Sequence, residues 1–139
     1  MKIAIAANAA GEHLKEVVKS YLVDNKYEVE DLSDKDIFTG TMEVVKAIKS
    51  GKADRGIVMD DYGVAPFMIA SKNHGIICAP VYEYYTADMT RQHNSTQMIC
   101  LGAEITAEKL SCKLVQAFLD TEYAAGRHQV RVDMLDRML

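Results

Sequence analysis

The sequence has few of the features that mark membrane, nucleic-acid-binding or secreted proteins. No apolar run approaches the roughly 18 residues that a membrane span requires. The apolar start at residues 1–7 is too short, and too closely followed by Asn8 and Glu12, to be a signal peptide. The net charge is −4 and the two signs are interspersed, so there is no basic stripe for nucleic acid. We therefore expect a cytoplasmic protein that binds neither a membrane nor nucleic acid.

Signals for disulfides, metals and nucleotides are equally sparse. The three cysteines, Cys78, Cys100 and Cys112, are odd in number and widely spaced, which favours buried reduced thiols over disulfides. The four histidines are scattered without the spacing of metal ligands. The turn at residues 7–11 lacks the full glycine fingerprint of a dinucleotide site. We expect neither a metal nor an organic cofactor.

What the sequence does contain is an alternation of two periodicities. Five short apolar runs have the length of strands buried on both faces: residues 2–7, 27–32, 55–59, 75–80 and 97–101. Between them, apolar residues recur with helical spacing at 14–22, 42–48, 84–89 and 110–118. For 139 residues this pattern predicts one domain, residues 1–139, with an α/β fold. The expected architecture is a Rossmann-like three-layer sandwich around a five-stranded parallel sheet.

Two further helices complete the predicted fold. Residues 63–71 are apolar almost throughout and predict a short buried helix with Pro66 near its start. Residues 128–138 predict a C-terminal helix with more apolar surface than a terminal helix needs, and we expect it to pack on a partner subunit. The apolar residues of this helix are Val130, Val132, Met134, Leu135 and Met138. Residues 33–40 form the only extended polar loop in this interpretation.

Open parallel sheets bind ligands beyond the carboxyl ends of their strands. In the predicted fold these ends are residues 6–11, 60–63, 82–83 and 102–104. Asp60 and Asp61 lie at one of them, where a carboxylate could act as a base if burial raised its pKa. The favoured interpretation is that they cap the helix that follows.

Two short segments carry groups suited to phosphate and proton chemistry. His93 can change protonation near neutral pH, and the neighbouring Asn94 only donates and accepts hydrogen bonds. Arg127 and Arg131 fall at i and i+4 of a helix, so two guanidinium forks can converge on one phosphate. Together they indicate a phosphorylated small molecule and half of an isomerase site.

The same residues have plainer interpretations on chemistry alone. A histidine at a polar helix end is more often a surface or capping residue than a catalyst. Helix arginines are commonly solvated or paired, here with Asp133 or Glu122.

A set of segments distributed along the chain decides between these interpretations: residues 1–5, Ala10-Gly11 followed by Leu14-Lys15, residues 53–57, His93-Asn94, residues 101–103 and Gly126-Arg127-His128. These segments resemble the family of type B ribose-5-phosphate isomerases and galactose-6-phosphate isomerases, and the resemblance covers essentially the whole chain. It implies interconversion of aldose and ketose phosphates through an enediol. It also implies that His93 helps open the sugar ring, that Asn94 binds substrate, and that Arg127 and Arg131 anchor the phosphate.

Both turns that carry the family's remaining catalytic groups differ here. The family has Asp-His-Ala-Gly after the first strand and a base in Cys-Gly-Thr-Gly after the third. This chain has Asn8-Ala9-Ala10-Gly11 and Asp60-Asp61-Tyr62-Gly63, and Pro66 stands where one branch of the family has a glutamate base. Family pockets draw residues from two subunits, so a chain can lose one half-site and still complete that of its partner.

The resemblance therefore implies an A-type subunit of a heteromeric galactose-6-phosphate isomerase that needs a B-type partner subunit with the fuller turns. Its reaction would interconvert galactose 6-phosphate and tagatose 6-phosphate. Two alternatives stay open. One is a homo-oligomeric isomerase, a homodimer when alone, that uses Asp60 or Asp61 as base. The other is a non-catalytic relative that binds sugar phosphates.

Overall fold

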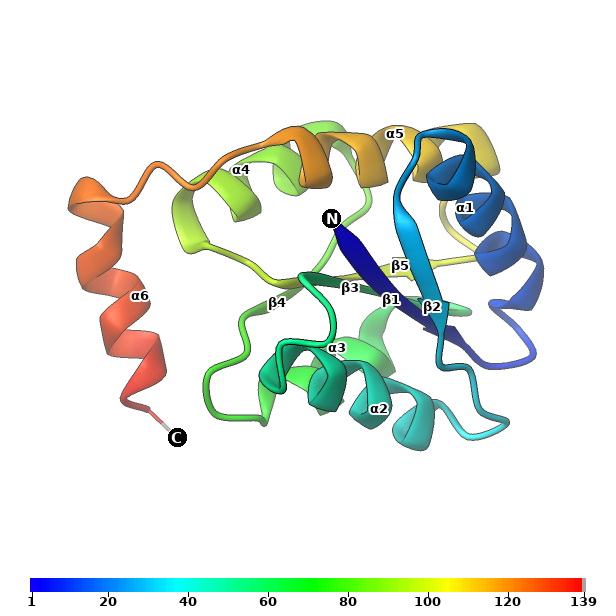
Figure 1. Ribbon diagram of the computed structural model, residues 1–139, viewed down its shortest axis with the longest axis horizontal. Coiled ribbons are helices and arrows are strands. Elements are labelled where there is room, and N and C mark those ends of the chain that lie inside the picture. Colours follow the sequence, from blue (N-terminus) through cyan, green and yellow to red (C-terminus); the bar gives the residue numbers. More distant parts are fainter. Residues whose placement is uncertain (139) are drawn as a thin grey trace.

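The computed structural model describes residues 1–138 and forms a parallel sheet between two layers of helices (Figure 1). The strands are β1 (Lys2–Ala7), β2 (Glu28–Asp31), β3 (Arg55–Asp60), β4 (Cys78–Pro80) and β5 (Met98–Gly102), in the order β2-β1-β3-β5-β4. The helices are α1 (Glu12–Asp24), α2 (Ile37–Lys49), α3 (Val64–Ser71), α4 (Tyr84–Asn94), α5 (Glu108–Asp120) and α6 (Gln129–Asp136), and a 3-10 turn, η1 (Gly126–His128), precedes α6. The predicted five-stranded parallel α/β sandwich is confirmed. None of the helices within residues 1–138 is long and apolar enough to cross a membrane.

Successive residues of each central strand enter different cores, because side chains of a strand alternate between the two faces of the sheet. Ile3 and Ile5 pack in the core beneath α1, α4 and α5, whereas Ala4 and Ala6 belong to the core beneath α2 and α3. All four are fully buried. Strands covered on both faces account for the continuous apolar runs in the sequence.

Several element boundaries differ from the sequence prediction, and two of the differences have a clear local cause. The strand expected at 75–80 begins only at Cys78, because Gly75 has a φ of 76° and the backbone N–H of Ile77 donates to the side-chain Oε1 of Gln97 (2.8 Å). The polar loop expected at 33–40 ends at Asp36. The carboxylate of Asp36 accepts hydrogen bonds from the backbone N–H groups of Phe38 and Thr39 and so caps α2.

The C-terminal helix stands at the side of the sandwich, next to the end of α4 (Figure 1). It is shorter than the predicted 128–138, and Arg127 lies in the 3-10 turn before it rather than in α6. Val132 is buried, whereas Val130, Met134 and Leu135 are exposed, Met134 by 59%. Packing of these exposed residues on a partner stays a prediction.

Candidate functional site

The predicted site residues lie at opposite edges of the sheet. Because all strands are parallel, α4 starts at the carboxyl edge after β4 and ends at the amino edge before β5. His93 and Asn94 occupy the last two positions of α4 and therefore lie at the amino edge. The turns after β1 and β3 lie at the carboxyl edge. The five residues of β5 separate the two edges by about 16 Å.

At the amino edge the structure brings His93 against a residue that the sequence analysis did not select. The rings of His93 and His128 are stacked, with centroids 4.2 Å apart and planes inclined by 11°. His128 lies between Arg127 and Arg131 in the sequence. Its contact with His93 therefore places the segment that contains both arginines next to the end of α4. The 3-10 turn and α6 place both arginines at the surface. The side chains of His93, Arg127 and Arg131 therefore lie in one cluster. With Asn94 and His128 they form what we call the amino-edge cluster.

Neither arginine of this cluster is neutralised within residues 1–138. The ion pairs of the described residues involve only lysines and one histidine, and none includes Arg127 or Arg131. Asp133, the nearest candidate partner in sequence, instead accepts a hydrogen bond from Nε2 of Gln129 (2.7 Å). Exposed guanidinium groups without carboxylate partners suit an anionic ligand such as a phosphate.

The charged groups of the amino-edge cluster change the pKa of His128. Desolvation lowers the pKa of His128, and the neighbouring His93, Arg127 and Arg131 lower it further. His128 is therefore neutral near pH 7, and the arginines supply the lasting positive charge.

Asn94 is held at the end of α4 by a local network. The following residue, Ser95, has a left-handed φ of 56° and ends the helix. Arg91 is buried one turn earlier, and its Nη1 donates to Oγ of Ser95 (3.3 Å) and to the carbonyl oxygen of Thr96 (3.1 Å). Asn94 itself is exposed. Its Nδ2 donates a long hydrogen bond to Oγ1 of Thr90 (3.5 Å), and its Oδ1 has no donor within residues 1–138, so the amide oxygen can contact a ligand at the surface.

The carboxyl edge has a different character, because its polar groups are used internally. Oδ1 of Asn8 accepts from the backbone N–H of Gly11 (3.1 Å), which closes the turn after β1. A Cβ at Gly11 would lie 2.4 Å from the carbonyl oxygen of Met59, so only glycine lets this turn approach the end of β3. The two turns therefore meet at the point where the strand order reverses.

Asp60 is 3% exposed, and its Oδ1 accepts hydrogen bonds from the backbone N–H groups of Tyr62 (3.2 Å) and Gly63. Gly63 is the N-cap of α3, so the carboxylate secures the turn that leads into the helix, close to the predicted capping function. Burial raises the pKa of Asp60, and the nearby Asp61 raises it further, while the two backbone donors oppose these effects. The structure shows no such bond for the side chain of Asp61 within the described residues.

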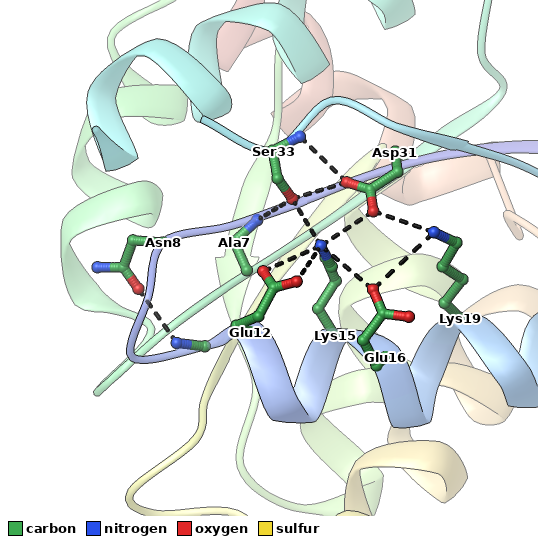
Figure 2. A network of polar contacts seen from close by, with 9 residues as sticks. Ala7, Asn8, Glu12, Lys15, Glu16, Lys19, Asp31 and Ser33 are labelled. Atoms are coloured by element: carbon green, nitrogen blue, oxygen red, sulfur yellow. Dashed lines mark hydrogen bonds and ion pairs between the residues drawn. The ribbon is translucent and has the colours of Figure 1, made fainter. Parts of the chain in front are cut away.

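A buried lysine lies behind the turn after β1 (Figure 2). The side chain of Lys15 is 4% exposed, and its Nζ lies 2.9 Å from Glu12, 3.3 Å from Glu16 and 2.9 Å from Asp31. Nζ also donates to Oγ of Ser33 (3.2 Å), and the same oxygen accepts from the backbone N–H of Ala7 (3.1 Å). We call these groups the Lys15 network. It links α1, the loop after β2 and the last residue of β1.

Proteins with similar sequences and structures indicate the family of this chain. A match to the ribose/galactose isomerase family covers residues 3–135. The chain is 45% identical to the galactose-6-phosphate isomerase subunit LacA 2 of Streptococcus pyogenes serotype M1, over 99% of both chains. It is 43% identical to the galactose-6-phosphate isomerase subunit LacA of Staphylococcus aureus (strain JH9), again over 99% of both.

Solved structures with the same fold include two ribose-5-phosphate isomerases of type B. The protein from Thermotoga maritima superposes with a TM-score of 0.96 at 32% identity, covering 99% of this chain and 98% of that one. The protein from Clostridium thermocellum superposes with a TM-score of 0.97 at 32% identity, covering 99% and 97%. Fold and relatives together define the class of α/β aldose–ketose isomerases. Within it, the chain belongs to the ribose/galactose isomerase family.

Proposed function

We propose that residues 1–139 form a single sugar-phosphate isomerase domain, the A-type subunit of a heteromeric galactose-6-phosphate isomerase. The subunit interconverts galactose 6-phosphate and tagatose 6-phosphate in the cytoplasm, without a cofactor, when a B-type subunit is bound. The identity to two LacA subunits over 99% of the chain supports this assignment over a ribose-phosphate enzyme, whose solved relatives reach 32%.

The observation that carries the proposal is the separation of the two edges. The amino-edge cluster lies about one strand length from Asn8 and Asp60, too far for one sugar phosphate to touch both. An active site that uses both kinds of group must combine the amino edge of one subunit with the carboxyl edge of another. The exposed apolar residues of α6, which carries Arg131, suit such a partner contact.

In this site each residue of the cluster has a distinct task. Arg127 and Arg131 bind the phosphate through charge-assisted hydrogen bonds, and Asn94 binds a sugar hydroxyl. His93 donates a proton to the ring oxygen as the bond between this oxygen and the anomeric carbon breaks, and takes up the proton of the anomeric hydroxyl. The open-chain aldose then loses the proton at C2 to a base of the partner while O1 gains a proton, and the resulting enediol gains a proton at C1 while O2 releases its hydroxyl proton to give the ketose.

The experiment is an activity assay of the chain alone and mixed with a B-type subunit that carries a Cys-Gly-Thr-Gly turn. We expect almost no isomerisation of galactose 6-phosphate by the purified chain and full turnover in the mixture. The variant Asp60→Cys should stay inactive on its own, because a base without its positioned surroundings contributes little. Inactivity of the mixture would contradict the proposal and favour the alternative of a non-catalytic relative that binds sugar phosphates.

One observation favours the homo-oligomeric alternative, in which Asp60 is the base. Burial raises the pKa of Asp60 toward the range in which a carboxyl group can exchange protons. Against this, Oδ1 already accepts two backbone hydrogen bonds. Strong activity of the purified homo-oligomer that disappears in Asp60→Asn would establish the alternative.

A further inference from the structure

His128 is placed on His93 by a specific path of the chain. After α5, Oγ1 of Thr121 donates to Oδ1 of Asp88, and the backbone N–H of Ala124 donates to the carbonyl oxygen of Gln92 (2.9 Å). Both acceptors belong to α4. The connection is therefore fastened to α4 at two points before it reaches the stacked ring.

The chain turns into η1 and α6 through an unusual backbone conformation. Ala125 has a φ of 50° and a ψ of −132°, a region that residues other than glycine rarely adopt, and Gly126 follows with a φ of 54°. The backbone N–H of His128 then donates to the carbonyl oxygen of Ala125 (3.0 Å). Such a conformation persists only where surrounding contacts hold it, and this hydrogen bond and the stack of the two rings are the contacts that follow it.

The electrostatics of the stack favour one arrangement of charge. The pKa of His128 is lowered by desolvation, by the nearby His93 on α4, and by Arg127 and Arg131 on its own segment. A neutral His128 ring can lie flat against His93 whether His93 carries one proton or two, whereas two imidazolium rings would repel each other. The stack can thus persist while His93 takes up and releases a proton.

We propose that His128 is a positioning residue for His93. Its ring lies parallel to the His93 imidazole and fixes the direction of the two ring nitrogens at the end of α4, where the side chain is otherwise only half-buried. The inference rests on the proposed function, because the orientation of His93 matters for turnover only if His93 takes part in ring opening. It adds a residue whose contribution lies in ring orientation rather than in contact with the substrate.

The test compares two substitutions of His128 in the assembled A-type and B-type complex. His128→Phe keeps a flat aromatic ring and loses the nitrogens, whereas His128→Ala loses the stack. Glu122→Gln, a change at an exposed position of the connection between α5 and η1, is the matched control for disturbance of the segment. The substrates are galactose 6-phosphate, which must open, and erythrose 4-phosphate, an aldose phosphate that cannot close a furanose ring.

For His128→Ala we expect kcat with galactose 6-phosphate to fall about tenfold or more and KM to change less than threefold, with erythrose 4-phosphate affected much less. His128→Phe should retain most of the activity, and Glu122→Gln all of it. A purely structural contribution would lower activity toward both substrates equally. A contribution through phosphate binding would raise KM in both His128 variants. Either result overturns the proposal.

Two measurements separate failure of this inference from failure of the proposed function. If His93→Ala leaves turnover intact, the proposed function of His93 fails, whatever His128 does. The stack itself is read from the NMR signals of the His93 ring, which should lose their ring-current shift in His128→Ala and keep one in His128→Phe. Unchanged His93 signals in His128→Ala would exclude the stack in solution and with it the positioning of His93.

Discussion

The two edges of the sheet handle charge in opposite ways. At the carboxyl edge, Lys15 is buried among carboxylates (Figure 2). Asp60, at the same edge, is held by backbone donors. At the amino edge, Arg127 and Arg131 are exposed and have no ion-pair partner within residues 1–138. Charged groups that pair within one chain, or that accept backbone hydrogen bonds, hold turns of the backbone in place. Charges that remain unpaired at the surface are available to a ligand or a partner.

This contrast also explains how the chain can differ from its family in one place and not in the other. The turns after β1 and β3 are held by Gly11, by Asp60 and by the Lys15 network. Their conformation therefore does not require the acid, histidine or cysteine of the family pattern. A turn can therefore lose the chemical groups of the family pattern and keep its shape.

The largest expected effect comes from the amino-edge cluster. His93→Ala should lower kcat of the assembled enzyme toward cyclic substrate by about 10²- to 10⁴-fold, the usual contribution of a general acid or base. Loss of activity toward an open-chain aldose phosphate should be far smaller, because that substrate bypasses ring opening. Steady-state kinetics with both substrates measure the difference. Equal losses would mean that His93 only positions the substrate.

The next effect concerns phosphate binding. Arg131→Ala should weaken sugar-phosphate binding by about 1.5 to 3 kcal/mol, the range for hydrogen bonds to charged groups, which raises KM by roughly 10- to 150-fold. Because the side chain is exposed, the melting temperature should hardly change. Arg137→Ala, which removes the arginine that follows α6, is the control and should leave KM as it is. An unaltered KM in Arg131→Ala would remove Arg131 from the phosphate site.

The carboxyl edge should respond in stability instead. Lys15→Met leaves the carboxylate of Asp31 and its neighbours without their buried cation, and we expect a loss of about 3 kcal/mol in the free energy of unfolding. Lys19 also contacts Asp31 (3.2 Å) but is more exposed, so Lys19→Met should cost less than about 1 kcal/mol. Urea unfolding of both variants gives the comparison. Equal small losses would show that the Lys15 network contributes no more than a surface ion pair.

The fold was largely readable from the sequence, and the site only in part. Residues 2–7 form β1 as predicted, because a strand buried on both faces leaves a continuous apolar run. The start of β4 was not predictable, since it depends on the side chain of Gln97, 20 residues away. Sequence resemblance predicted His93 and Arg127 as site residues, and this stays a prediction. Their distance from the carboxyl edge follows from the topology alone.

Two features of the site depend on tertiary contacts that no local pattern reveals. His128 reaches His93 only because Ala125 adopts a positive φ and the preceding connection is tied to α4. Lys15 stands in an amphipathic helix, where a lysine is normally taken for a solvent-facing residue. Its burial results from the approach of Asp31 at the end of β2 and of Ser33 in the loop that follows. A carboxyl group and a hydroxyl group two residues apart, Asp31 and Ser33, are too common a pattern to indicate this in advance.

The smallest expected effect is the response of the same network to acid. Hydrogen bonds from Ser33, Lys15 and Lys19 hold the pKa of Asp31 below its usual range and outweigh the opposing effect of burial. A carboxyl group whose pKa is lower in the folded state contributes stability above the pKa of the unfolded chain, near 3.9 for Asp, and this stability is lost as the pH falls further. The melting temperature should therefore drop between about pH 5 and pH 3, and Asp31→Asn should make this drop shallower. Asp24→Asn, which alters an exposed carboxylate at the end of α1, should leave the slope unchanged. The same slope in Asp31→Asn as in the unmodified chain would mean that the acid sensitivity arises elsewhere, and that the carboxyl edge is not stabilised by this ion pair.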